Sequence, residues 1–106
     1  MVRSEAGVAA RRQARFFFVE GRVQGVGFRF FVEHEANRLG VRGYVRNLYD
    51  GRVEVYAVGE EAVLQQLRGR LEQGPPGSRV EQVTERQAPH KSYRDFSIEA
   101  SGQPAG

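Results

Sequence analysis

Residues 16–46 read FFFVEGRVQGVGFRFFVEHEANRLGVRGYVR, and this stretch decides the fold because its hydrophobic period changes twice. The run of Phe and Val over residues 16–23 is typical of a strand covered on both faces. Over residues 28–39 apolar side chains recur at helical spacing, and Gly40 is suited to end a helix in a left-handed conformation. Residues 41–46 return to a strand pattern. The stretch therefore predicts a β-α-β unit whose two strands run parallel and end at the same edge of one sheet.

The rest of the chain continues this alternation of strands and helices. Asp50-Gly51 is a turn signal that separates the second strand from a third. The further elements that we expect are a strand over 53–57, an amphipathic helix over 63–71 and strands over 80–84 and 93–98. The order is β-α-β-β-α-β with a short last strand. It predicts an α+β sandwich, in which two helices cover one face of a mostly antiparallel sheet.

The composition excludes several classes of protein. With 106 residues the chain has room for one small domain, and it contains no cysteine for a disulfide, a thiolate metal site or a thiol nucleophile. His34 and His90 are far apart among polar neighbours, so we expect surface histidines and neither a metal nor a cofactor. No apolar run is long enough to cross a bilayer, and no stretch resembles a secretory signal. We therefore expect a cytoplasmic protein without a membrane partner.

The positive charge of the chain is unevenly distributed. The formal net charge is +3, and it lies entirely in residues 1–15, whereas the remaining residues are neutral as a whole. A neutral domain has no bulk field to attract a polyanion, so nucleic acid is not an expected partner. We expect a disordered basic extension over residues 1–15, with an Arg-rich targeting sequence as the alternative, a single domain over 16–99 and a frayed tail over 100–106.

The loop GRVQGVG at residues 21–27 is suited to bind an anion. It opens onto a helix N-terminus, where unpaired N–H groups and the helix dipole favour negative charge. Gly25 and Gly27 let successive N–H groups turn inward without a Cβ in the way. Arg29, in the first turn of the helix, can add a bidentate charged donor. Asn47 ends the second strand at the same rim, so the sequence predicts a phosphate-sized site there.

Two motifs, GRVQGVGFR at residues 21–29 and GYVRNLYDGRVEV at residues 43–55, resemble the signatures of the acylphosphatase family. The resemblance covers about residues 16–98, and the paired motifs are far more specific than either glycine pattern alone. It implies a ferredoxin-like α/β sandwich. It also implies a hydrolase that cleaves the carboxyl-phosphate bond of acyl phosphates without a metal.

The resemblance further assigns the residues of the site. Arg29 would bind the phosphate, and Asn47 would position the attacking water. The backbone N–H groups that would hold the phosphoryl oxygens belong to Gln24, Gly25, Val26, Gly27 and Phe28. A carboxylate is a good leaving group because its conjugate acid has a pKa of about 4, so no general acid is required. We expect a monomer, with inorganic phosphate as product and competitive inhibitor.

Two other functions remain as alternatives. RNA-recognition domains share the same element order, and Arg42-Gly43-Tyr44 begins like their aromatic strand motif. However, Arg46 stands where a second stacking aromatic belongs, and the motif lies on the second strand instead of the third. The other alternative is an accessory acylphosphatase-like domain, as found in larger carbamoyl-transfer maturation proteins. We favour an independent enzyme because no further domain is recognisable in the chain.

Overall fold

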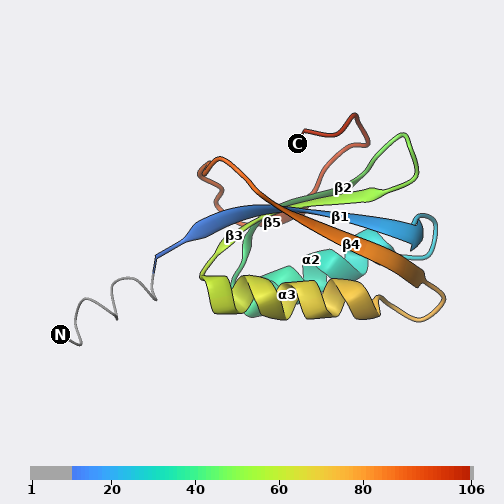
Figure 1. Cartoon of the computed structure of the whole chain (residues 1–106), viewed down its shortest axis with the longest axis horizontal. Helices are drawn as coiled ribbons and strands as arrows, with labels where there is room; N and C mark the ends of the chain where they lie inside the picture. The colour runs from blue at the N-terminus through green and yellow to red at the C-terminus, as the bar shows by residue number, and fades with distance from the viewer. Residues whose placement is uncertain (1–10, 106) are drawn as a thin grey trace.

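Five strands and two helices make up residues 11–105, the part of the chain that the computed structural model describes (Figure 1). The elements are β1 (Gln13–Arg22), α2 (Phe28–Leu39), β2 (Arg42–Asn47), β3 (Val53–Gly59), α3 (Glu61–Gln73), β4 (Arg79–Gln87) and β5 (Phe96–Ile98). The strand order in the sheet is β4-β1-β3-β2-β5, and every pair is antiparallel except β2 and β5. The predicted α+β, ferredoxin-like arrangement is thus confirmed.

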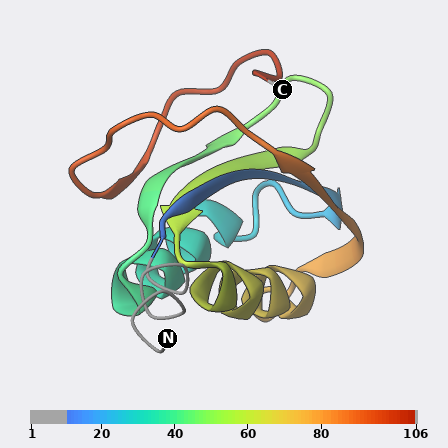
Figure 2. The same cartoon turned by 60° about the vertical axis from the view of Figure 1, so that its left-hand side comes forward.

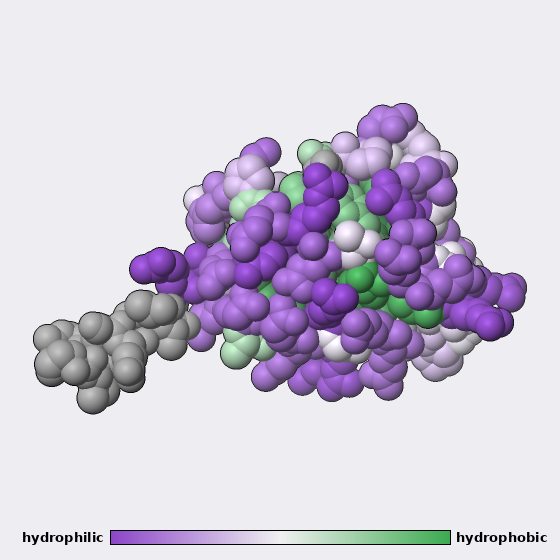
Figure 3. All heavy atoms as spheres, in the orientation of Figure 1, coloured by the Kyte–Doolittle hydropathy of each residue, from purple (hydrophilic) through white to green (hydrophobic). Residues whose placement is uncertain are grey.

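Both helices pack against the same face of the sheet and enclose the larger hydrophobic core (Figures 1 and 2). Phe17 and Val19 of β1 are fully buried there, together with Val32 and Ala36 of α2 and Leu67 of α3. Figure 3 shows a mostly hydrophilic surface on the face turned to the viewer, with apolar residues in smaller patches. The alternating residues of the strands and the apolar stripes of the helices therefore meet in one core, as their periods predict.

A second, aromatic cluster lies on the outer face of the sheet, the face that carries no helix. Phe16 and Tyr44 pack there against Tyr56, whose hydroxyl donates to the carbonyl oxygen of Pro89 at 2.6 Å and accepts from the N–H of Lys91 at 2.8 Å. The segment between β4 and β5 therefore covers this face (Figure 2). Tyr44 is only 7% exposed, so the face is not the open aromatic platform that an RNA-recognition domain requires.

The first strand starts earlier than the sequence suggested. It begins at Gln13, and Arg15 is buried, with its guanidinium paired to the carboxylates of Glu61 and Glu85. The expected extension over residues 1–15 is therefore wrong for residues 13–15, which pair with β3 in the sheet. The rest of that prediction falls largely on residues 1–10, which lie outside the described residues. None of the described helices is both long and apolar enough to span a bilayer.

The C-terminal segment does not fray but continues past β5 along the end of β2. The N–H of Gly102 donates to the carbonyl oxygen of Asn47, and the N–H of Tyr49 donates to that of Gly102, both at 3.1 Å. The N–H of Ala105 donates to a carboxylate oxygen of Glu54 at 2.8 Å. Residues 102–105 thus close over the outer face beside the end of β2 (Figure 1).

Candidate active site

The topology brings two distant parts of the chain to one pocket. β1 and β2 both pair antiparallel with β3, so they run parallel to each other. Their C-terminal ends therefore lie at the same end of the sheet. The loop after β1 leads into α2 there, and Asn47 is the last residue of β2. They surround a cavity of about 200 Å³, lined by Val23, Gly25, Gly27, Phe28, Arg29, Phe30 and Asn47.

The loop between β1 and α2 forms one side of this cavity. Gly25 and Gly27 both have φ of 76°, a left-handed conformation that disfavours other residues. A Cβ built at either glycine would meet no protein atom within 4 Å, so within the protein itself it is the left-handed conformation that requires glycine at these positions. Gly27 caps α2 without a side-chain hydrogen bond, and no acidic residue stands in the first turn. Within residues 11–105, no hydrogen bond engages the N–H groups of residues 24–28, which leaves them available for an anion.

Arg29 supplies a positive charge to the cavity. Its side chain is half-buried, and within the described part of the chain it forms no ion pair. Several other arginines are instead neutralised by carboxylates, among them Arg15, Arg46, Arg52 and Arg68. The guanidinium of Arg29 is therefore free to engage an anionic group in two parallel hydrogen bonds.

Asn47 contributes an unpartnered acceptor. Its Oδ1 is buried and has no hydrogen-bond partner, although its side chain lines the cavity. Leaving a buried polar atom unsatisfied costs about 1–3 kcal/mol, so proteins retain one mainly where it serves a function. Because Asn47 lines the cavity, a small rotation of its amide would let Oδ1 accept a hydrogen bond from a water or a ligand there.

Gln24 has a role that the sequence did not reveal. Only its backbone N–H was assigned to the site, but its side-chain Nε2 donates to the carbonyl oxygens of Leu48 and Arg52, both at 2.9 Å. These bonds tie the glycine loop to the turn that follows Asn47. The one sequence signal for Gln24 is that it lies within GRVQGVGFR, a motif that carries the family resemblance.

The remaining charges near the site are compensated or distant. Asp50 accepts hydrogen bonds from the guanidinium and the N–H of Arg52, and these bonds lower the pKa of its carboxyl group. His34 and His90 are both exposed. Among the described residues, no three His, Asp or Glu side chains gather in a group that could hold a metal ion. Arg29 is therefore the one charged residue among those that line the cavity.

Comparison with known proteins assigns this arrangement to a family. A family model described as acylphosphatase matches residues 15–98. The chain belongs to the acylphosphatase family. The acylphosphatase of Solibacter usitatus is 51% identical over 86 residues, which span 81% of this chain and 90% of that protein. The acylphosphatase of Koribacter versatilis is 48% identical over 98 residues, or 92% of this chain and 89% of the relative.

Solved acylphosphatase structures share the fold. The crystal structure of acylphosphatase from Bacillus subtilis matches with a TM-score of 0.79 and 40% identity, covering 84% of this chain and 99% of that one. An acylphosphatase from Coxiella burnetii gives a TM-score of 0.80 at 35% identity, with 83% and 93% covered. Full-length HypF, in its phosphate- and nucleotide-bound form, matches with a TM-score of 0.82 and 33% identity over 92% of this chain but only 13% of its own.

These likenesses confirm the family that the two motifs indicated. The relatives named acylphosphatase are matched over about nine-tenths of their length, so the chain is a hydrolase of acylphosphatase type. Its substrate class is accordingly the acyl phosphates, which are small molecules with an anionic phosphoryl group.

Proposed function

We propose that the cavity around Arg29 and Asn47 hydrolyses acyl phosphates to a carboxylate and inorganic phosphate, without a metal and with water as the nucleophile. One observation carries this proposal: an unpaired guanidinium and an unpartnered buried amide oxygen line the same cavity, beside a helix N-terminus. A cation and free N–H groups suit an anionic substrate, and the amide oxygen suits a polar molecule beside it.

The loop and Arg29 bind the phosphoryl group in this proposal. The transition state of phosphoryl transfer spreads negative charge over three equatorial oxygens. Preorganised donors aimed at those oxygens lower the barrier most effectively, because they need no reorientation during the reaction. The guanidinium of Arg29 and the backbone N–H groups of residues 24–28 are donors of this kind. We expect the same groups to bind inorganic phosphate, which makes the product a competitive inhibitor.

Asn47 orients the water. Its Oδ1 accepts one hydrogen bond from the water, which leaves a lone pair of the water oxygen directed at phosphorus. The new P–O bond forms while the bond to the acyl oxygen breaks, and the bonding electrons leave with the carboxylate. The protons of the water pass to phosphate oxygens and solvent. No strong base is needed, since the leaving carboxylate has a conjugate acid with a pKa of about 4.

We also propose that the chain acts as a monomer in the cytoplasm. The residues proposed for the site all belong to one chain, so the proposed hydrolysis requires no second copy. The absence of cysteine removes any dependence on an oxidising compartment.

Hydrolysis of acetyl phosphate and benzoyl phosphate by the purified full chain tests this function. We expect turnover of both that does not change when EDTA is added. In water labelled with heavy oxygen, the label should enter inorganic phosphate and not the carboxylate. Activity that is lost with EDTA and restored by a divalent metal would contradict the metal-free mechanism, and label in the carboxylate would contradict attack at phosphorus.

A further inference from the structure

Phe30 is an apolar side chain at the cavity that the reaction chemistry leaves unused. It lies in the first turn of α2 and is 67% exposed, although it is a large aromatic residue. Its neighbours on the helix behave differently: Phe28 is buried, and Phe31 packs against the core. Phe30 nevertheless lines the same cavity as Arg29 and Asn47. Phe30 therefore stands at the rim of the cavity as an exposed apolar residue.

The size of the cavity decides where the acyl group lies. A volume of about 200 Å³ is smaller than the ~300–1,000 Å³ of pockets that enclose a drug-sized ligand. The phosphoryl group on the loop N–H groups and Arg29, together with the attacking water, takes up part of this volume, and the cavity is open at its rim. An acyl group of more than a few atoms must therefore extend to the rim, where the exposed ring of Phe30 stands.

The lining offers no polar alternative for the acyl group. Arg29 is its one charged residue and Asn47 its one polar side chain, and both are engaged by the phosphoryl group and the water in the proposed reaction. No carboxylate is present in the lining to attract a positively charged acyl group. The acyl group is therefore left with an apolar contact, which Phe30 can provide.

We propose that Phe30 is a specificity-determining residue that contacts the acyl group, so that aromatic and large apolar acyl phosphates are preferred over small ones. This inference rests on the proposed function. An aromatic acyl group gains from the contact in two ways, because apolar surface leaves water on both partners and because two rings attract each other in offset or edge-on arrangements. An acetyl group is too small to gain either.

A comparison of substrates in the Phe30→Ala variant tests the inference. We expect kcat/KM for benzoyl phosphate to fall roughly three- to tenfold, as for the loss of one aromatic contact, with less than about a twofold change for acetyl phosphate. Inhibition by inorganic phosphate should stay unchanged, because phosphate has no acyl group. Phe30→Tyr should restore the preference for benzoyl phosphate.

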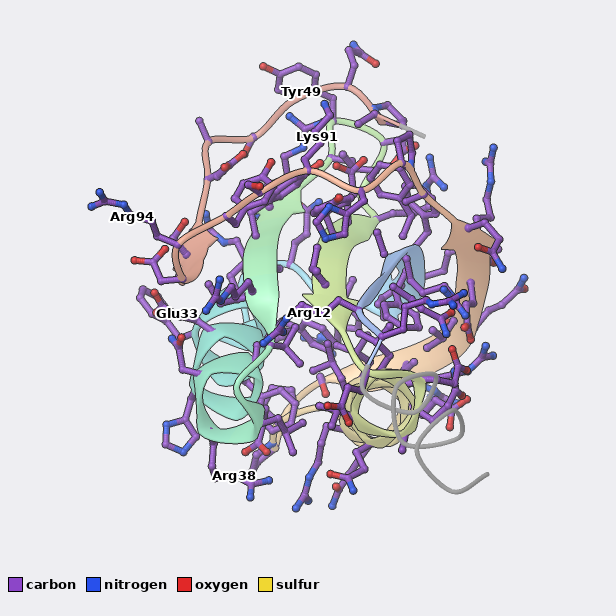
Figure 4. All side chains as sticks on the ribbon, turned by 90° about the vertical axis from the view of Figure 1, so that its left-hand side faces the viewer. Arg12, Glu33, Arg38, Tyr49, Lys91 and Arg94 are labelled. Atoms are coloured by element: carbon purple, nitrogen blue, oxygen red, sulfur yellow. The ribbon has the colours of Figure 1, made fainter. Side chains whose placement is uncertain are left out.

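Tyr49 provides a matched control. It is a large aromatic residue with a similar exposure of 69%, but it does not line the cavity and lies on the side of the sheet away from α2 (Figure 4). Tyr49→Ala should leave the ratio of the two kcat/KM values unchanged. Equal losses for both substrates in Phe30→Ala, or an unchanged ratio, would overturn the role of Phe30 while the proposed function stands. Failure of the unmodified chain to hydrolyse either substrate would overturn both.

Discussion

The side-chain Nε2 of Gln24 lies 2.9 Å from the carbonyl oxygen of Leu48, the residue that follows Asn47. A second hydrogen bond of the same length reaches the carbonyl oxygen of Arg52. One side chain therefore joins the loop that presents the N–H groups to the hairpin that carries the Asn47 amide. Catalysis by positioning depends on such links, because a displacement of about 1 Å can lower a rate by about 10²-fold.

Replacing Gln24 with alanine should separate the two halves of the site. We expect kcat/KM for acyl phosphates to fall roughly 10- to 100-fold, with a smaller effect on inhibition by phosphate, because the loop and Arg29 keep their own conformation. Gln24→Glu is the matched variant: it has the same shape but offers acceptors to two carbonyl oxygens. Steady-state kinetics on both variants checks this, and normal activity in Gln24→Glu would rule out a positioning role.

Arg29→Ala should remove most of the activity because it weakens binding of the phosphoryl group. The loss of a charge-assisted bidentate contact should lower kcat/KM on the order of 10² to 10⁴-fold. Inorganic phosphate should inhibit the variant much less than the parent. Arg38→Ala is a control on the same helix, since Arg38 is exposed and pairs with Glu35, and should retain normal kinetics. Equally tight phosphate inhibition in Arg29→Ala would exclude it as the phosphate ligand.

Asn47→Ala should lower kcat by roughly 10² or more while inhibition by phosphate stays nearly constant, which is the signature of an interaction made mainly in the transition state. The substitution also deletes a buried acceptor without a partner, so the free energy of unfolding should not decrease. Asn47→Asp should not restore turnover, because its negative charge would stand beside the incoming phosphate. Parallel losses in kcat and phosphate inhibition would assign Asn47 to binding instead.

Glu85 on β4 should make folding stability depend on pH. Burial raises the pKa of its carboxyl group, but hydrogen bonds from Arg68, Gln65 and Arg15 outweigh burial and leave the pKa below its ordinary value. A pKa that is lower in the folded state means that the ionised carboxylate of Glu85 stabilises the fold. This contribution to the free energy of unfolding is complete above the ordinary glutamate pKa of about 4.3, and it is lost as the pH falls through the lower pKa of the folded state. Urea unfolding at a series of acidic pH values should show this loss, and Glu85→Gln should show less of it.

Removal of residues 102–106 should destabilise the fold. The truncation removes two backbone hydrogen bonds of Gly102, one donated to the carbonyl oxygen of Asn47 and one accepted from the N–H of Tyr49. It also removes the hydrogen bond that the N–H of Ala105 donates to the buried carboxylate of Glu54. We expect the free energy of unfolding to fall by about 1–3 kcal/mol, measured by urea denaturation. Gln103→Ala keeps the backbone groups and should behave as the parent. An unchanged unfolding midpoint in the truncated chain would show that these bonds contribute nothing.

The β-α-β unit was predictable because its signals are carried by side chains. The apolar stripe of α2 and the left-handed Gly40 mark the helix and its end, and the parallel course of β1 and β2 places Arg29 and Asn47 at one rim. β4 was recognised only over residues 80–84, since most of its residues are exposed and its ends are polar and charged. An edge strand of this kind lacks the apolar alternation of an inner one.

Two features were hidden for another reason: their contacts are made to the backbone. The pairing of Gly102 with Asn47 and Tyr49 uses only main-chain groups, so the small residues of the C-terminal segment carry no hydrophobic period that would reveal it. The bonds of Gln24 reach carbonyl oxygens more than twenty residues away, and a carbonyl group is present in every residue. Apart from the family motif that contains Gln24, the residue types at those positions therefore gave no sign of either contact.

The two edge strands of the sheet affect whether the chain can pair with other copies of itself. At one edge, β4 is rich in charged side chains, and its register with β1 shifts between Glu20 and Gly21. At the other edge, β5 is only three residues long, and the segment around Gly102 continues the pairing past it. Unpaired strand edges are templates for intermolecular pairing, and charge, irregular register and short length all discourage it. Without β5 and the segment that follows it, β2 would become a bare edge with Tyr44 and Val45 at its centre. We therefore expect the C-terminal segment to oppose aggregation of the folded chain as well.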